Sequence, residues 1–190
     1  MEVPTQTVEI FKILSKGQFI NSNSSDKKIS DLYRIIDDEQ NFDNLYDYFL
    51  NINFVLERGN EYFYFSRRES KVEIERKLET VFKWIDIVDF LKTFRPDFCS
   101  GVRFSPSEIL VLLKTNADLE AKLDGLRKYT DKNTQHDILE KALKILTDDS
   151  FIEVEDPNNQ QYKALASFDY LEQLILTINI PEDIKNEIPE

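Results

Sequence analysis

The chain has 190 residues, a length that suits two small domains, since compact domains commonly contain about 50 to 200 residues. Its net charge is −12, and this excess of acids disfavours binding of a polyanion over the whole surface. Glycine and proline occur only four and six times, so a hairpin-rich all-β fold is poorly supported. Helix is therefore expected to dominate.

The sequence also favours a cytoplasmic protein. Cys99 is the only cysteine, which excludes an internal disulfide and agrees with a reducing compartment. Residues 1–7 lack a basic region followed by an apolar stretch, and no window approaches the roughly 18 apolar residues that span a bilayer. We therefore expect neither an export signal nor a membrane segment.

The first 66 residues predict three helices followed by a β-hairpin. A short helix is expected within 8–20, a second begins after the capping residue Asp26, and a third opens at Asn41. Two extended runs then flank a turn that starts at Arg58. The residues expected to face the core are Val8, Phe11, Leu14, Ile29, Leu32, Ile36, Phe42, Leu45 and Phe49.

A similar order returns in the second half of the chain. Ser105 and Pro106 suit the cap and first position of a helix, and further helices are expected over 118–128 and from about Asn133. Two extended runs joined by the turn residues 156–159 predict a second hairpin. The expected core residues are Ile109, Leu110, Leu113, Leu119, Leu123, Leu126, Ile138, Ala142, Leu143 and Leu146.

One long helix is predicted between the two repeats. Apolar residues recur at spacings of three and four over 69–95, and a final helix is expected over 168–178 before an acidic tail. Three helices followed by a two-stranded wing form a winged helix, so we predict a mainly α protein with small β-hairpin wings, in which tandem winged-helix domains are joined by a long helix. The predicted division is 1–68 for the first domain, 69–104 for the connecting helix and linker, 105–166 for the second domain, and 167–190 for the last helix and tail.

The third helices argue against sequence-specific DNA readout. A recognition helix in the major groove needs donors such as Arg, Lys, Asn or Gln, but residues 41–51 contain no basic residue and carry Asp43 and Asp47. In the second unit, Lys141 and Lys144 are balanced by nearby acids, as on an ordinary solvated helix face.

We predict no catalytic, cofactor-binding or metal site. His136 is the only histidine, and no cysteine or carboxylate is expected near it at zinc-ligand spacing. The four glycines are scattered, so no phosphate-binding loop is present. The acidic pairs 37–38 and 148–149 lie at predicted helix ends among polar residues, which favours a structural role over acid–base catalysis.

The first wing carries aromatic side chains on both faces. Tyr62 and Tyr64 alternate with Phe63 and Phe65, whereas a hairpin on a solvated edge has one polar face. Two covers are possible: the long helix that follows, or the surface of a dimer or partner peptide. These four residues are therefore candidates for an interface.

Basic residues gather around the end of the same wing. Arg67, Arg68 and Lys71 follow the second strand, and Arg58 lies at the wing tip. This cluster is either a solvated charge run or a contact for a phosphate backbone, and its four members are the candidates for weak, non-specific DNA contact.

The chain resembles the MukE and MksE family, the tandem winged-helix subunits that bind the kleisin of bacterial SMC-type condensins. The likeness lies in VEIFKILSKGQFI at 8–20 and in LYDYFLNINFVLERGNEYFYFSRR at 45–68, where a helix runs into the aromatic wing. The second unit matches in layout, and length and acidity also agree. No family residue is matched closely enough to carry over as a defined contact.

From its residues we predict a non-enzymatic protein without a cofactor, and the resemblance implies a nucleoid-associated homodimer. Such a protein clamps a kleisin, works beside an SMC-like ATPase through that kleisin, and touches DNA within the closed assembly, in chromosome organisation or in plasmid defence. The alternatives are a winged-helix transcription regulator or replication initiator, which the acid-rich third helices oppose, and an enzyme with an unfamiliar site.

Overall fold

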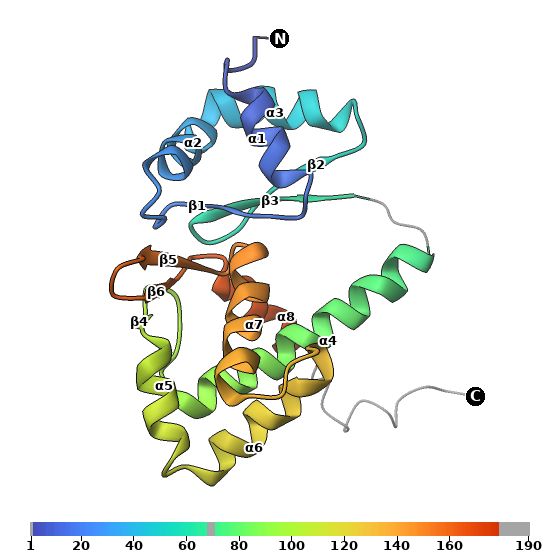
Figure 1. Cartoon of the computed structure of the whole chain (residues 1–190). Helices are drawn as coiled ribbons and strands as arrows, with labels where there is room; N and C mark the ends of the chain where they lie inside the picture. The colour runs from blue at the N-terminus through green and yellow to red at the C-terminus, as the bar shows by residue number, and fades with distance from the viewer. Residues whose placement is uncertain (1, 68–70, 179–190) are drawn as a thin grey trace, which may run out of the picture.

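The computed structural model describes residues 2–67 and 71–178 of the chain. The helices and strands form two units, one above the other in Figure 1. The first unit contains α1 (Thr7–Leu14), β1 (Ile20–Asn21), α2 (Lys27–Asp37), α3 (Glu39–Leu50), β2 (Val55–Arg58) and β3 (Tyr62–Ser66).

The second unit repeats this order with one long helix in the place of α1 and with additional helical segments. It contains α4 (Lys71–Phe94), β4 (Arg103–Phe104), α5 (Pro106–Leu113), α6 (Ala117–Gly125), the 3-10 helix η1 (Leu126–Tyr129), α7 (Gln135–Asp148), β5 (Ile152–Asp156), β6 (Gln161–Ala164) and α8 (Phe168–Ile178). A mainly α fold with small β wings, arranged as tandem winged helices, is thereby confirmed.

Capping side chains fix the start of two helices where the sequence predicted them. Asp26 accepts a hydrogen bond from the backbone N–H of Lys28 at the start of α2. Ser105 and Glu108 form a reciprocal capping box on α5, with Pro106 in its first turn. Such caps satisfy backbone donors that the helix itself leaves free.

Two other helices begin about two residues away from their predicted starts. The third helix was expected from Asn41 but begins at Glu39, because the carboxylate of Asp38 accepts a hydrogen bond from the N–H of Asn41 at 3.0 Å. The helix α7 begins at Gln135, since the hydroxyl of Thr134 supplies its cap.

Each hairpin belongs to a three-stranded antiparallel sheet. The strand orders are β1-β3-β2 and β4-β6-β5, with Ile20 paired to Phe63 in the first sheet and Phe104 paired to Tyr162 in the second. The hairpins were predicted, but β1 and β4 were not. Each of these strands has only two residues, too few to show an alternating pattern.

The core of the first unit differs from the prediction at α1. Ile10 and Leu14 are fully buried and one turn apart, whereas Val8 is 61% exposed. Side chains four positions apart share one helix face, so burying Ile10 turns Val8 toward solvent. The remaining buried residues of this core are Ile20, Leu32, Ile36, Leu45, Phe49, Leu56 and Phe63.

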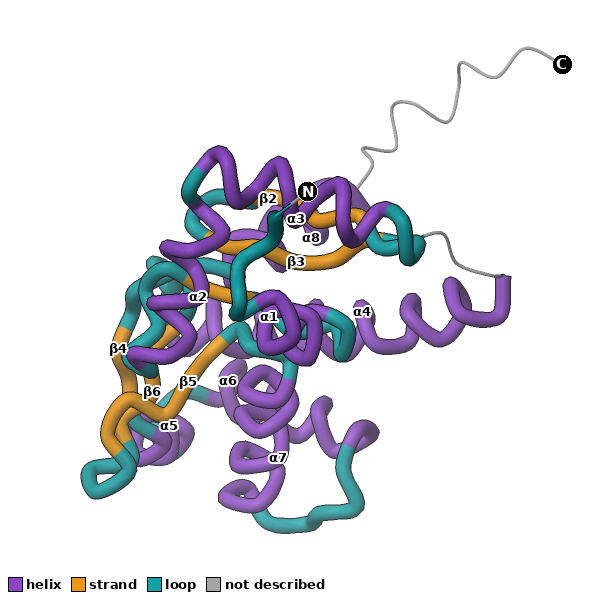
Figure 2. Tube along the Cα trace, turned by 90° about the horizontal axis from the view of Figure 1, so that it is seen from above, coloured by secondary structure: helices purple, strands orange, loops and turns teal. Residues whose placement is uncertain are grey.

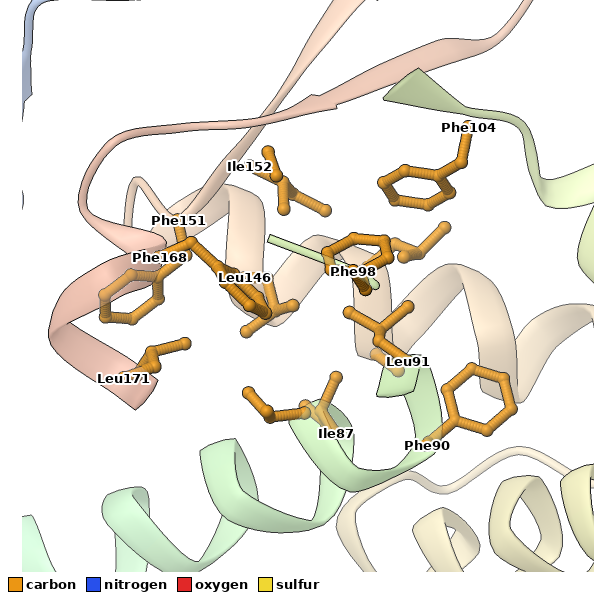
Figure 3. Packing of buried hydrophobic residues seen from close by; sticks show 14 of the residues in the cluster. Ile87, Phe90, Leu91, Phe98, Phe104, Leu146, Phe151, Ile152, Phe168 and Leu171 are labelled. Carbon is orange, nitrogen blue, oxygen red and sulfur yellow. The ribbon is translucent and has the colours of Figure 1, made fainter. Parts of the chain in front are cut away.

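The long helix α4 divides into a buried and an exposed half. Toward its C-terminus, Ile87, Phe90 and Leu91 are buried among side chains of the second unit (Figure 3). Toward its N-terminus, Leu78 and Phe82 are exposed, and Figures 1 and 2 show this half extending beyond the other elements. The helix therefore contributes directly to the core of the second unit, and the predicted division into a connector and two domains stays a prediction.

Within the described ranges, no helix is both long enough and apolar enough to cross a bilayer.

Candidate interaction surfaces

The strand β3 turns one aromatic face into the core of the first unit. Phe63 is fully buried and lies 5.9 Å from Phe42 between ring centroids. Phe65 packs on Phe49 at 4.7 Å in an edge-on arrangement. Burial of such large apolar rings is a main stabilising contribution to a small domain.

The opposite face of β3 packs between the two units. Tyr62 and Tyr64 each lie 5.6 Å from Phe19, and Tyr64 lies 5.3 Å from Tyr170 of α8. Phe19 in turn contacts Phe151 of the second unit at 5.1 Å. Burial, followed by the neighbouring tyrosines and Asp169, raises the pKa of Tyr62 to about 12.

The chain itself therefore covers much of both faces of this wing. Tyr62 and Phe63 are almost completely buried, so they offer no free surface to another molecule in this structure. The sequence had suggested the long helix or a partner as the cover. It did not connect the wing with Phe19, Phe151 or Tyr170, and a partner interface at these four positions stays untested.

Asparagine side chains join the two units next to this aromatic contact. The side chain of Asn21 accepts a hydrogen bond from the N–H of Ser167 at 2.6 Å and donates one to the carbonyl of Ser150 at 3.2 Å. Two residues later, Asn23 accepts a hydrogen bond from the N–H of Ala166 at 2.9 Å. The end of β1 and the loop after it thus satisfy backbone groups of the second unit.

A nearly buried lysine extends this junction. The ammonium of Lys163 lies 3.0 Å from Glu153 and 3.3 Å from Glu155, and it donates a hydrogen bond to the hydroxyl of Ser25 at 2.5 Å. Hydrogen bonds from Arg103, then from Lys163 and Ser25, lower the pKa of Glu155 to about 2. We call the side chains of Asn21, Asn23, Ser25, Glu153, Glu155 and Lys163 the clasp.

The clasp was not predicted. The sequence showed residues 21–25 only as a polar loop. A buried lysine in a strand needs charged partners, but its partners here come from a neighbouring strand and from a loop 138 positions away. Only the composition of this segment, with two asparagines and three serines, could have suggested that its side chains form hydrogen bonds with backbone groups elsewhere in the chain.

The side chain of Arg58 contacts two residues of the first unit. Its guanidinium lies 3.7 Å from Asp37 and 4.5 Å from the ring centre of Phe42. The second contact is a cation–π interaction. A phosphate contact by Arg58 would therefore compete with both of these partners, and its role in DNA contact stays a prediction.

The other predicted basic candidates lie around the start of α4. Arg67 pairs with Glu73 at 3.2 Å, Lys71 is exposed, and Arg68 lies outside the described residues. An exposed pair of this kind is worth little and still leaves the arginine accessible. The structure brings Arg67 to the first turn of α4 but does not test whether this group meets DNA.

The exposed faces of the third helices are not basic. On α3, Glu39, Asp43 and Asp47 are exposed and follow one another at spacings of four. On α7, Lys144 pairs with Asp148 at 2.8 Å. A phosphate backbone would meet repulsion from the acids of α3, and on α7 it would meet a lysine with an acid beside it.

The expectation that no carboxylate lies near His136 at ligand spacing was wrong. Asp137 and Glu140 place carboxylate oxygens near its imidazole, and ligand atoms of the three residues lie within 4.8 Å of one another. The residues fall in the first turns of α7, where Glu140 follows Asp137 and His136 at spacings of three and four, which place side chains on one helix face. The side chains are exposed or partly exposed, and such acidic groups are common on protein surfaces without an ion.

Taken together, the two sheets, the paired helical units and the junction define a tandem winged-helix protein. The sequence model of the family described as condensin complex protein MksE matches residues 5–175, which include almost all of both units. The chain belongs to the MksE family and is thus a subunit of the condensin-complex class. A comparison with curated proteins found no match.

Proposed function

We propose that the protein is a non-enzymatic subunit of an SMC-type condensin-like complex. It binds the kleisin, acts beside an SMC-like ATPase through that kleisin, and forms a homodimer. Its own contact with DNA is weak and independent of sequence. It works in the cytoplasm, associated with the nucleoid, in chromosome organisation or plasmid defence, and needs no cofactor.

The family match over both units is the observation that carries this proposal. The clasp adds a physical reason why both units act together. Hydrogen bonds between residues 18–25 and the second unit join the two winged helices, so they present one surface to a partner chain. A scaffold that holds a kleisin across both units benefits from such fixed geometry, because little ordering is then required on binding.

The charge distribution supports a protein partner over a DNA operator. The acidic face of α3, with Glu39, Asp43 and Asp47, occupies the position of a recognition helix. Electrostatic attraction to phosphates supplies most non-specific DNA affinity, and this helix opposes it. A regulator that reads a sequence through α3 is therefore disfavoured.

The test is capture of a purified kleisin from a condensin of the MksE type. The full chain, immobilised through a tag, is incubated with the purified kleisin and, separately, with the purified SMC-like ATPase. We expect direct capture of the kleisin, and retention of the ATPase only when the kleisin is present. Absence of kleisin binding, together with tight binding of one duplex sequence, would support the regulator instead.

A further inference from the structure

An apolar stripe on the exposed half of α4 has no cover within the described residues. Phe82 is 56% exposed, Leu78 is 47% exposed, and Ile85 continues the same face one turn later. Residues separated by three and four positions share one side of a helix. A half-helix with large exposed apolar groups is marginal in water unless something packs on it.

The stripe continues into a groove between α4 and α8. Ile85 and Val88 form one wall, Ile175 and Leu176 form the other, and the cavity measures about 400 Å³. Leu176 is 74% exposed, although it lies on the last turns of a helix that is otherwise packed on the second unit. The apolar surface therefore spans two helices.

Opposite charges stand at the two ends of the same helix face. Lys71 lies at the N-terminal end and Asp89 lies 18 positions later, after about five turns. Both side chains are exposed. Their midpoint is position 80, and Leu78 and Phe82 lie symmetrically about it. A surface with this symmetry is complementary to itself when a second copy runs antiparallel.

We propose that a second copy of this chain covers the stripe. The α4 helices of the two copies pack antiparallel, with Leu78 of one copy against Phe82 of the other and Lys71 facing Asp89. The proposed α4 surface rests on the proposed function, because it is the contact surface of the homodimer within that complex.

The charges along this half-helix favour a second copy over a strongly charged ligand. Four bases and three acids are interspersed between positions 71 and 83, namely Lys71, Glu73, Glu75, Arg76, Lys77, Glu79 and Lys83. A mixed surface of this kind repels neither itself nor a neutral partner, but it offers no net attraction to DNA or to a highly acidic peptide. Since Asp89 already pairs with Lys122 at 3.0 Å, the contact with Lys71 sets direction more than strength.

Light scattering on the full chain tests the surface. We expect a dimer for the natural sequence and a dissociation constant at least about tenfold higher for Phe82→Glu, because a carboxylate would be buried against Leu78. The matched control is Val111→Glu on α5, where the side chain is 66% exposed and outside the stripe. If both variants weaken the dimer equally, or if neither variant weakens it, the proposed surface is wrong.

Charge reversal tests the antiparallel orientation. Lys71→Glu and Asp89→Lys should each weaken the dimer, and the two together should restore it, because the facing pair is then rebuilt with opposite signs. Thermal unfolding of each variant shows whether it folds. If the two reversals simply add, the orientation is wrong.

The same variants separate this inference from the proposed function. Kleisin capture is measured alongside light scattering for the natural chain and for Phe82→Glu. A natural chain that is monomeric at tens of micromolar but still captures the kleisin would overturn the inference and leave the proposed function intact. A dimer that depends on Phe82 but captures no kleisin would uphold the surface and contradict the proposed function.

Discussion

The side chain of Asn21 accepts a hydrogen bond from the backbone N–H of Ser167 at 2.6 Å, across 146 positions of sequence. Both residues are buried. The amide of Asn21 is thus shared between the edge strand of one winged helix and the start of α8 in the other. An unpaired N–H at such a site would be costly, so this one side chain helps to hold the two units in a fixed relation.

Replacing Asn21 by alanine should therefore destabilise the whole chain. The change leaves the N–H of Ser167 without its partner, and we expect the free energy of unfolding to fall by about 2 kcal/mol. Urea denaturation measures this. The control is Asn158→Ala in the exposed turn of the second wing, which should change stability by less than about 0.5 kcal/mol. Equal effects of the two changes would show that Asn21 is not a structural tie.

The aromatic wing should behave as core. Phe63 is fully buried, so Phe63→Ser should lower the free energy of unfolding by about 3–5 kcal/mol, through lost transfer energy and the cavity left behind. The association state of the folded fraction should not change. Thermal unfolding and light scattering on the same sample give both values. Loss of the dimer at unchanged stability would instead place Phe63 in an interface.

The sequence predicted most of the fold because helix periodicity is a local property. The spacing of Leu119, Leu123 and Leu126, all buried, is visible without knowledge of the rest of the chain. The assignment of Val8 to the core failed because two faces of a short apolar helix look alike until its packing is known. The strands β1 and β4 were missed because two residues carry no period.

The junction was harder to predict than the elements. The partners of Asn23 and Lys163 lie more than 130 positions away, and no local pattern pairs them. For the wing, the sequence showed that both faces needed a cover but not that Phe19 and Tyr170 provide part of it. Long-range contacts are set by how the units dock, which is decided by the packing of the whole surface.

Stability should fall in acid partly through the clasp. The pKa of Glu155 is lowered from 4.5 to about 2 by Arg103, Lys163 and Ser25, so its stabilising contribution is complete above about pH 4.5 and is lost as the pH falls toward about 2. Glu155→Gln should therefore reduce stability at pH 7, and the difference from the natural chain should shrink below about pH 4.5. Urea unfolding at pH 7, 5 and 3 measures the difference. The exposed Glu79→Gln is the control, and a difference for Glu155→Gln that stays constant with pH would contradict the assignment.

DNA binding by the purified protein should be weak, independent of sequence and lost at physiological salt. Non-specific complexes typically have dissociation constants of about 10⁻⁴ to 10⁻⁶ M, and the acidic face of α3 opposes even this. Changing Arg67, Arg68 and Lys71 together to Glu should abolish the residual binding but leave kleisin capture intact, because phosphate contacts do not determine that interaction.

The matched control for the DNA-binding variant changes the exposed Lys12, Lys16 and Lys114 to Glu, which alters the net charge equally. Since Lys71 also belongs to the proposed dimer surface, Phe82→Glu is titrated in parallel to separate loss of the dimer from loss of the basic group. The measurement is a fluorescence titration with random and selected duplexes at several salt concentrations. A dissociation constant of about 10⁻⁸ M or below for one duplex at about 150 mM salt would establish a sequence-specific regulator, since that is the range of specific complexes.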